Sequence, residues 1–458
     1  MFLFCRRGRN SGGRCSTPTT LTRVSQVIDS RCECRLSLFI SRAGEGISVG
    51  SEQAHTETTV EKSTPPPPYS KDDGKALQDW FRVMRDERPV HQDPATGAWM
   101  VLRYADVVAA SLDHATYSSE LWRAYPAEWG KGDAWGEGRL TEMDPPKHRL
   151  LRAVIGKAFT NRTVAGLAPE IEATVERLLD AADGRTEIDV ARDLADPLPV
   201  MVIAELIGLP FEDRELLRGW ADRLLSFEVG DLAGEDLVKA IDAAGAELLA
   251  YLREHYRLRR AAPKDDLFSR LVTAEVEGER LTEETVVNLG KLLLIGGHAT
   301  TACSLASLVF ELLRHPDALT AVRQDADLIP AAIEESVRYR PAVVNSLRLT
   351  TRETELGDVT IPAGQFVSLS ALSANHDERQ FDAPERFDIH RQHNQHVGFG
   401  QGVHYCLGAP LARTEIRIAL SALLRRFPVL ERTDGPLQYY RNPSIAGLRS
   451  FPVAVGRG

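Results

Sequence analysis

The sequence predicts a mainly α-helical fold with small β sheets, and three features support this expectation. Apolar residues recur with the helical period through much of residues 160–280. A proline-free stretch from residue 282 to 315 could form one helix about 50 Å long, at 1.5 Å per residue, with Thr282 as its expected N-cap. That stretch is apolar almost all round, so it should be buried. The strand-like segments, by contrast, are short and are separated by turn residues.

Local patterns place the individual elements. Asp144 could cap a helix that starts at Pro145 and Pro146. The segment 120–142 is irregular, and a loop of this length inside a domain usually has a functional reason. Further helices are expected at residues 75–87, 104–112, 171–181, 197–207, 213–225, 237–256, 330–340 and 411–427, and strands at 97–103, 346–349, 355–361 and 366–369.

Composition limits the class of function. The chain has 458 residues, of which 43% are hydrophobic and 26% charged, as in an ordinary soluble globular protein. Its net charge of −10 argues against nucleic acid as the main partner, because phosphate binding requires a basic face. The apolar runs near the N-terminus are too short to span a bilayer, so we expect no membrane anchor.

The N-terminus differs from the rest of the chain. Residues 1–48 contain eight arginines, three acidic residues and four of the six cysteines. We interpret residues 1–64 as a disordered extension, which a start codon assigned too far upstream would also explain, and residues 65–458 as the functional domain. A transit peptide is the alternative for the Arg- and Ser-rich, acid-poor start. The two remaining cysteines, Cys303 and Cys406, form no disulfide framework, which agrees with a reducing cytoplasm.

Cys406 lies in a glycine-rich run just before the helix expected at 411–427. Unpaired N–H groups at a helix N-terminus stabilise a thiolate. Gly400, Gly402 and Gly408 allow tight turns and the close approach of a flat, bulky group. This combination suits a sulfur ligand presented to a metal from one side. From these residues alone, a buried structural cysteine beside a glycine-rich turn is an equal alternative.

The whole run from Phe399 to Arg413 resembles the haem-binding signature of cytochrome P-450, F-G-x-G-x-H-x-C-L-G-A-x-L-A-R, at every fixed position. The resemblance implies the P-450 fold, shaped like a triangular prism with a long central helix over haem b. It makes Cys406 the axial ligand of the haem iron, with Phe399 and Gly400 in the cofactor-binding loop.

The centre of the long helix reads Gly296-Gly297-His298-Ala299-Thr300-Thr301. Two mid-helix glycines cost roughly 1 kcal/mol each relative to alanine, so they require a reason, such as room for a planar cofactor and O2. The run resembles the family's oxygen-binding groove, [AG]-G-x-[DE]-T-T, and implies catalytic roles for Gly297, Ala299 and Thr300. Ala299, however, stands where the family has its acid. His298 is no substitute, because it points about 100° away on a regular helix.

The segment Met143–Arg152 resembles the family's M-D-P-P-x-H-x-x-x-R motif. His148 and Arg152 are four residues apart, so they share a helical face and offer two cationic donors to a carboxylate. The resemblance assigns both to the haem propionates, together with Arg348 and His404.

Glu335 and Arg338 form the family's E-x-x-R motif, and Arg386 is the expected third member of that charge network. A buried carboxylate shared by two guanidiniums makes bidentate hydrogen bonds and orders the surrounding core. A strand–turn unit over residues 442–453 should bring its tip to the pocket. The resemblance implies a substrate pocket lined by Leu292, Ile295, Gly296, Val344, Ser346 and Ile445.

The implied function is that of a haem-thiolate monooxygenase that activates O2 and oxidises a small to medium hydrophobic organic substrate. Electrons would come from NAD(P)H through a ferredoxin or flavodoxin and its reductase, which would bind a monomeric, cytoplasmic protein. Four arginines should form a basic patch for that partner, with an ordinary solvated helix face as an equal alternative: Arg149, Arg413, Arg417 and Arg425. Because of Ala299, peroxide-driven oxidation, coupling or ring formation is an alternative. A haem sensor or carrier without enzymatic activity is a second one.

Overall fold

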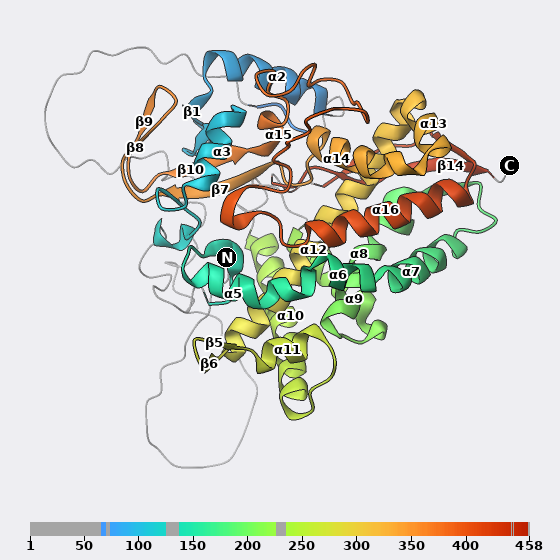
Figure 1. The fold of residues 1–458 in the computed structure, drawn as a ribbon, viewed down its shortest axis with the longest axis horizontal. Helices are drawn as coiled ribbons and strands as arrows, with labels where there is room; N and C mark the ends of the chain where they lie inside the picture. The colour runs from blue at the N-terminus through green and yellow to red at the C-terminus, as the bar shows by residue number, and fades with distance from the viewer. Residues whose placement is uncertain are drawn as a thin grey trace, which may run out of the picture.

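The computed structural model describes residues 66–69, 74–124, 137–225, 235–440, 442 and 444–456. The expected extension over residues 1–64 lies outside this part of the chain. Helices fill one side of the molecule, and the larger β sheet lies with α2, α3 and α15 at the opposite corner (Figure 1). The mainly helical fold with small sheets is therefore confirmed.

Most of the predicted helices form close to their expected bounds. The apolar segment 197–207 becomes α8 with these same ends, because Pro197 can start a helix and Gly208 ends it at φ 89°. The helices are α2 (Lys75–Glu87), α3 (Tyr104–Leu112), α5 (Lys147–Gly156), α6 (Asn161–Gly166), α7 (Ala168–Asp180), α8 (Pro197–Ile207), α9 (Arg214–Leu225), α10 (Glu235–Ala261), α11 (Leu267–Thr273), α12 (Glu283–Arg314), α13 (Pro316–Gln324), α14 (Ile329–Tyr339), α15 (Ala371–Ala374) and α16 (Ala409–Arg426).

Helix α12 is the central element. Its predicted N-cap is confirmed, since the side chain of Thr282 accepts a hydrogen bond from the backbone N–H of Thr285. The helix packs against α8, α10 and α16, and most of its apolar side chains are buried in the main core. Of the described helices, α12 alone is long and apolar enough to cross a bilayer, but most of that stretch is buried inside the protein. It is a core helix.

The largest sheet has five strands in the order β1-β2-β10-β7-β3. Strand β10 runs parallel to β2 and antiparallel to β7, with Phe366 opposite Leu349. A three-stranded sheet, β11-β14-β4, joins the C-terminus to the helical part. The strands are β1 (Val90–Gln92), β2 (Trp99–Val101), β3 (Tyr117–Ser118), β4 (Glu187–Asp189), β5 (Glu275–Val276), β6 (Glu279–Arg280), β7 (Asn345–Thr350), β8 (Thr354–Leu356), β9 (Val359–Ile361), β10 (Phe366–Ser370), β11 (Val429–Arg432), β12 (Gln438–Tyr439), β13 (Leu448–Ser450) and β14 (Pro452–Gly456).

Two local expectations were wrong. The segment 355–361 is not one strand but the hairpin β8–β9, which turns at Gly357 with φ 58°. The carboxylate of Asp144 does not cap α5. It accepts hydrogen bonds from the hydroxyl of Ser118 at 2.5 Å and the N–H of Ser119 at 3.0 Å instead, which ties the start of α5 to β3.

Gly138, in the segment before α5, packs closely against the start of α12. Replacing it by alanine should destabilise the protein. Its φ is 75°, and an added Cβ would lie 2.5 Å from the carbonyl oxygen of Thr285. The backbone strain and the overlap together should lower the free energy of unfolding by roughly 2–4 kcal/mol in urea titrations. Gly184→Ala is the matched control, because Gly184 has φ 80° with no atom within 4 Å of an added Cβ. Equal losses in the two variants would refute the steric argument.

Candidate active site

The loop before α16 has the conformation that its glycines suggested. Gly400 and Gly402 adopt positive φ, at 72° and 68°. An added Cβ at Gly402 would lie 2.9 Å from the carbonyl oxygen of Ser111, so this turn also requires glycine for space. The N–H of Cys406 donates to the carbonyl of Phe399 at 2.8 Å and closes the loop. Cys406 is thereby placed immediately before the first turn of α16.

Two backbone N–H groups influence the sulfur of Cys406. Burial raises the pKa of its thiol, whereas hydrogen bonds from the N–H groups of Gly408 and Ala409 lower it, as do the charges of Arg152 and Arg413. The first turn of α16 thus supplies N–H groups to the sulfur, which is the support a thiolate ligand requires.

An ion-pair network supports this loop from α14. Arg413 donates to both carboxylate oxygens of Glu334, at 2.6 and 2.8 Å, and His396 contacts the same carboxylate at 3.1 Å. The guanidinium of Arg413 lies 4.4 Å from the ring centroid of Phe399, a cation–π contact. Glu334 therefore fixes the arginine that packs on the first residue of the cysteine loop.

The Glu334 pair predicts a pH dependence of stability. Burial opposes ionisation, but hydrogen bonds from Arg413 and His396 lower the pKa of Glu334 from 4.5 to about 2. The pair's contribution is therefore complete above pH 4.5 and is lost as the pH falls towards 2. We expect Glu334→Gln to be less stable at neutral pH and its free energy of unfolding to vary less over that interval. Glu254→Gln, which breaks an exposed pair with Arg257, is the control for net charge. Identical pH profiles for Glu334→Gln and the parent protein would contradict this prediction.

Four cationic or titratable side chains from α5, β7 and the cysteine loop come together as expected. The rings of His148 and His404 lie 4.4 Å apart, and Arg152 donates to the carbonyl of Tyr405 at 2.5 Å. Buried Arg348 donates to the carbonyl of Leu347 at 2.8 Å. Within the described part of the chain, neither Arg152 nor Arg348 forms an ion pair with a carboxylate.

The electrostatics of this cluster favour an anion. Burial, and then the charge of Arg152, lowers the pKa of His148 to about 4. Burial and Arg348 lower the pKa of His404 to about 3. Both ring nitrogens of His148 are buried without a hydrogen-bond partner among the described residues, which is costly unless a ligand satisfies them. The donor set thus fits the propionate groups of haem.

The centre of α12 borders open space. Gly296 is exposed although most of the helix is buried, and an added Cβ there would meet only Leu292 of the same helix. The hydroxyl of Thr300 donates to the carbonyl of Gly296 at 2.7 Å, a contact of the kind that bends a helix locally. Gly297 packs on Ile203 of α8, and Ala299 is completely buried. The glycine-rich turn therefore leaves room beside Thr300 for a flat group.

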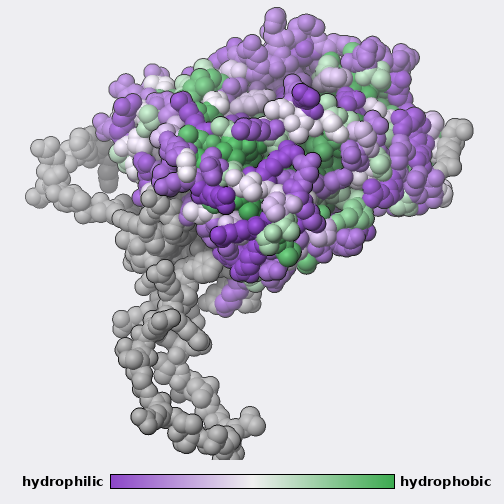
Figure 2. All heavy atoms as spheres, turned by 60° about the horizontal axis from the view of Figure 1, so that its bottom comes forward, coloured by the Kyte–Doolittle hydropathy of each residue, from purple (hydrophilic) through white to green (hydrophobic). Residues whose placement is uncertain are grey.

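The expected pocket segments lie side by side, with one difference in side-chain direction. Val343 pairs with Ile445 in an isolated bridge, so the C-terminal tip does reach the segment before β7. Val344, however, packs on the core cluster around Phe81, whereas the side chains of Val343 and Leu347 are exposed. Because successive residues of a strand point to opposite faces, Val343 and Val344 had to point in opposite directions. The sequence did not show which of the two faces the pocket. Leu292, Ile295, Ser346 and Ile445 are half-buried. Hydrophobic residues also gather in a hollow near the middle of the face in Figure 2, framed by hydrophilic ones.

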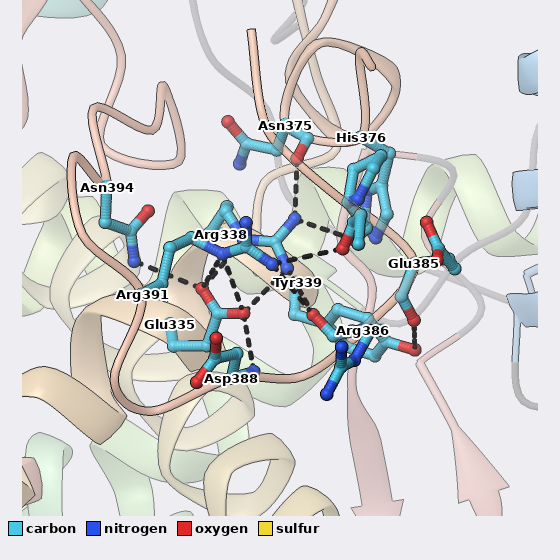
Figure 3. A network of polar contacts seen from close by, with 12 residues as sticks. Glu335, Arg338, Tyr339, Asn375, His376, Glu385, Arg386, Asp388, Arg391 and Asn394 are labelled. Atoms are coloured by element: carbon cyan, nitrogen blue, oxygen red, sulfur yellow. Dashed lines mark hydrogen bonds and ion pairs between the residues drawn. The ribbon is translucent and has the colours of Figure 1, made fainter.

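Glu335 and Arg338 form a buried network, but its third member is Arg391 and not Arg386 (Figure 3). Arg338 donates to both carboxylate oxygens of Glu335 at 2.7 Å, and Nε of Arg391 contacts them at 3.1 and 3.2 Å. Arg386 is exposed and contributes only its carbonyl oxygen, which accepts from Arg338 at 3.0 Å. The network joins α14 to the loop that leads to Cys406.

The four arginines of the expected basic patch are not equivalent. Arg413 is paired with Glu334, and Arg425 with Glu176. Arg149 and Arg417 are exposed, and neither forms an ion pair with a described residue. The unpaired positive charge of these four arginines is therefore smaller than the sequence suggested.

A cysteine near backbone N–H groups and a cluster of anion-binding side chains are together what a haem-thiolate protein requires, and the residues described above fit both requirements. Comparisons identify the family within that class: the chain belongs to the cytochrome P450 family, whose model matches residues 229–450. It is 51% identical over 388 residues to the cyclomarin C epoxidase CymV of Salinispora arenicola, covering 85% of this chain and 98% of that one. It is 41% identical to the erythromycin C-12 hydroxylase of Saccharopolyspora erythraea, over 84% and 96% of the two chains. The ligand-free structure of cytochrome P450 TbtJ1 superposes with a TM-score of 0.77 at 45% identity, over 84% and 98%.

The comparisons confirm the predicted class of function. The chain is a haem- and O2-dependent monooxygenase, and its relatives are bacterial epoxidases and hydroxylases of secondary metabolism. They do not favour the peroxide-driven or ring-forming alternative that Ala299 suggested.

Proposed function

We propose that this protein epoxidises or hydroxylates a mostly apolar secondary metabolite. The observation that carries the proposal is the 51% identity over nearly the whole of a cyclomarin C epoxidase. The uncharged tip around Ile445 and the exposed side chains of Val343 and Leu347 support an apolar ligand. A hydrophobic wall with few polar groups is typical of a pocket for such a molecule.

The roles of the site residues form part of this proposal. Haem would supply the redox chemistry of O2 activation, with Cys406 as its axial ligand. His148, Arg152, Arg348 and His404 would hold its propionates as hydrogen-bond donors. The hydroxyl of Thr300 would hold a proton close to the site of O2 binding.

The remaining assignments are also proposed. Residues 65–458 would form the haem domain of a monomeric cytoplasmic enzyme. A ferredoxin or flavodoxin, reduced by NAD(P)H through its reductase, would contact the exposed arginines Arg149 and Arg417.

The charge reversal Arg417→Glu should then raise the KM for the electron donor, and the difference in KM between variant and parent should shrink at high salt.

Optical titration of the holoprotein tests the substrate class. A panel of cyclic peptides, macrolactones, terpenes and fatty acids would be added to the ferric protein, and the haem absorption band followed. We expect the cyclic peptides or macrolactones to shift the band, and the shifted ligands to be oxidised when ferredoxin, its reductase and NADPH are supplied. A shift by fatty acids alone would overturn the proposed class.

The proposed propionate donors predict how tightly haem is held. Arg348→Leu removes a buried guanidinium and should speed haem loss by about tenfold or more, since a hydrogen bond to a charged group contributes roughly 1.5–3 kcal/mol. The rate can be measured by transfer of haem to excess apomyoglobin. Arg352→Leu is the control, because Arg352 follows β7 but is exposed and donates to Thr116 instead. If both variants lost haem at the parent rate, Arg348 would have no role in holding it.

A further inference from the structure

Asp196 occupies an unusual position at the start of α8. It follows a short π-helix, η6 (Val190–Ala195), and its own N–H donates to the carbonyl of Ala191, five residues back, at 2.8 Å. π-Helical turns are rare and are frequently found at functional sites. Although Asp196 is the N-cap residue of α8, its side chain makes no capping hydrogen bond. The carboxylate is therefore used elsewhere.

Both carboxylate oxygens of Asp196 contact side chains of other helices. Nε2 of His298, in α12, donates to Oδ1 at 2.9 Å and to the carbonyl oxygen of Asp196 at 3.1 Å. Nε of Arg218, in α9, lies 2.5 Å from Oδ2. Because both partners of Nε2 are acceptors, the imidazole must carry a proton on this nitrogen. Burial opposes ionisation of Asp196, but the contacts with His298 and Arg218 keep its pKa low.

This bridge reaches the centre of the active site. His298 is fully buried and lies in the same turn of α12 as Gly297 and Thr300. Arg218 belongs to α9, which packs against α10 and α12. A buried charged network of this kind contributes little net stability compared with apolar residues of the same volume. Its presence next to the glycine-rich turn points to a role in positioning.

Helix α9 has a second attachment near its C-terminal end. The side-chain amide of Asn442 donates to the carbonyl of Leu225 at 3.3 Å, and Arg449 lies 3.6 Å from the carboxylate of Asp222. These residues flank the tip that carries Ile445. Helix α9 is thus attached at two places: to α12 through Asp196, and to the segment that includes β12 and β13 through Asn442 and Arg449.

We propose that Asp196 is a positioning residue of the monooxygenase, which couples α9 to the turn of α12 that contains Thr300. Binding of a ligand beside the centre of α12 therefore affects the structure of α9. In the same way, a ligand that contacts α9 affects the structure of the turn that contains Thr300. The inference rests on the family's haem-dependent activity and is independent of the proposed substrate.

A double-mutant cycle in the holoprotein tests the coupling. Arg218→Gln and His298→Gln are combined, and the affinity for 4-phenylimidazole, a ligand of haem iron, is measured by optical titration. Arg218 and His298 interact through Asp196, so we expect the effects to deviate from additivity by about fivefold or more in Kd. The same cycle in the Asp196→Asn background should be additive. Arg223→Gln is the matched control, because Arg223 is also in α9 but pairs with the surface residue Glu247.

Hydrogen exchange provides a second readout, which needs only the parent protein and Asp196→Asn and not the double-mutant cycle. Binding of 4-phenylimidazole to the parent protein should slow amide exchange both around residues 296–300 and in α9. In Asp196→Asn the response of α9 should be lost while that of α12 persists. Additive effects in the parent background, or an unchanged response of α9 in Asp196→Asn, would overturn the proposal. Because the probe is not a substrate, failure of the proposed substrate class would leave this test unaffected.

Discussion

Replacing Cys406 by serine should abolish monooxygenase turnover, with a fall of at least roughly a thousandfold, or about 4 kcal/mol in transition-state stabilisation. A thiolate donates electron density to the iron in a way that a serine hydroxyl cannot reproduce. The change itself is nearly isosteric, and the N–H groups of Gly408 and Ala409 remain in place. The variant should therefore fold and bind haem with a different axial ligand.

The decisive measurement is the absorption spectrum of the ferrous–CO complex, which carries the red-shifted band of thiolate ligation. Cys406→Ser should lose that band. Cys303→Ala is the matched control, because Cys303 is the other cysteine of the described residues and is buried in α12 against Gly447. This control should keep the band and lose only stability. Retention of the band in Cys406→Ser would assign the ligand to another residue.

Elements set by local pattern were predictable. Helix α8 has the bounds expected from its apolar run, its proline start and its glycine end, all of which are short-range signals. The N-cap at Thr282 was read correctly for the same reason. The cysteine loop was also predictable, since its glycines are required by positive φ at Gly400 and Gly402.

Errors arose where distant segments decide the outcome. Asp144 was a reasonable helix cap by sequence, but β3 offers Ser118 and Ser119 to its carboxylate. The hairpin β8–β9 is the exception, because it is local and its signal was present in the sequence: Gly357 interrupts the apparent strand, and glycine there marks a turn. The bridge through Asp196 had none, since Asp196 and His298 are 102 residues apart. The choice between Arg386 and Arg391 is of the same kind, and it can be tested directly.

Removing Glu335 should produce a large loss of stability. The carboxylate is fully buried and accepts hydrogen bonds from Arg338, from Arg391, from the N–H of Asp388 at 2.9 Å and from Asn394 at 3.2 Å. Glu335→Ala would leave two guanidiniums without their counter-charge. Breaking a buried pair in this way costs about 3–5 kcal/mol, a large fraction of the 5–15 kcal/mol that typically separates folded from unfolded protein.

A comparison of two arginine variants decides which guanidinium belongs to this network. Arg391 lies almost fully buried against Glu335, so Arg391→Ala should lower the free energy of unfolding by about 2–4 kcal/mol. Arg386 is exposed and offers only its backbone carbonyl, which alanine retains, so Arg386→Ala should cost less than about 0.5 kcal/mol. Urea unfolding followed by circular dichroism and by haem absorbance would measure both. Equal losses of stability would restore Arg386 as the third member of the network. Because the network holds the loop that leads to Cys406, the Arg391 variant should also release haem at a lower urea concentration than the Arg386 variant.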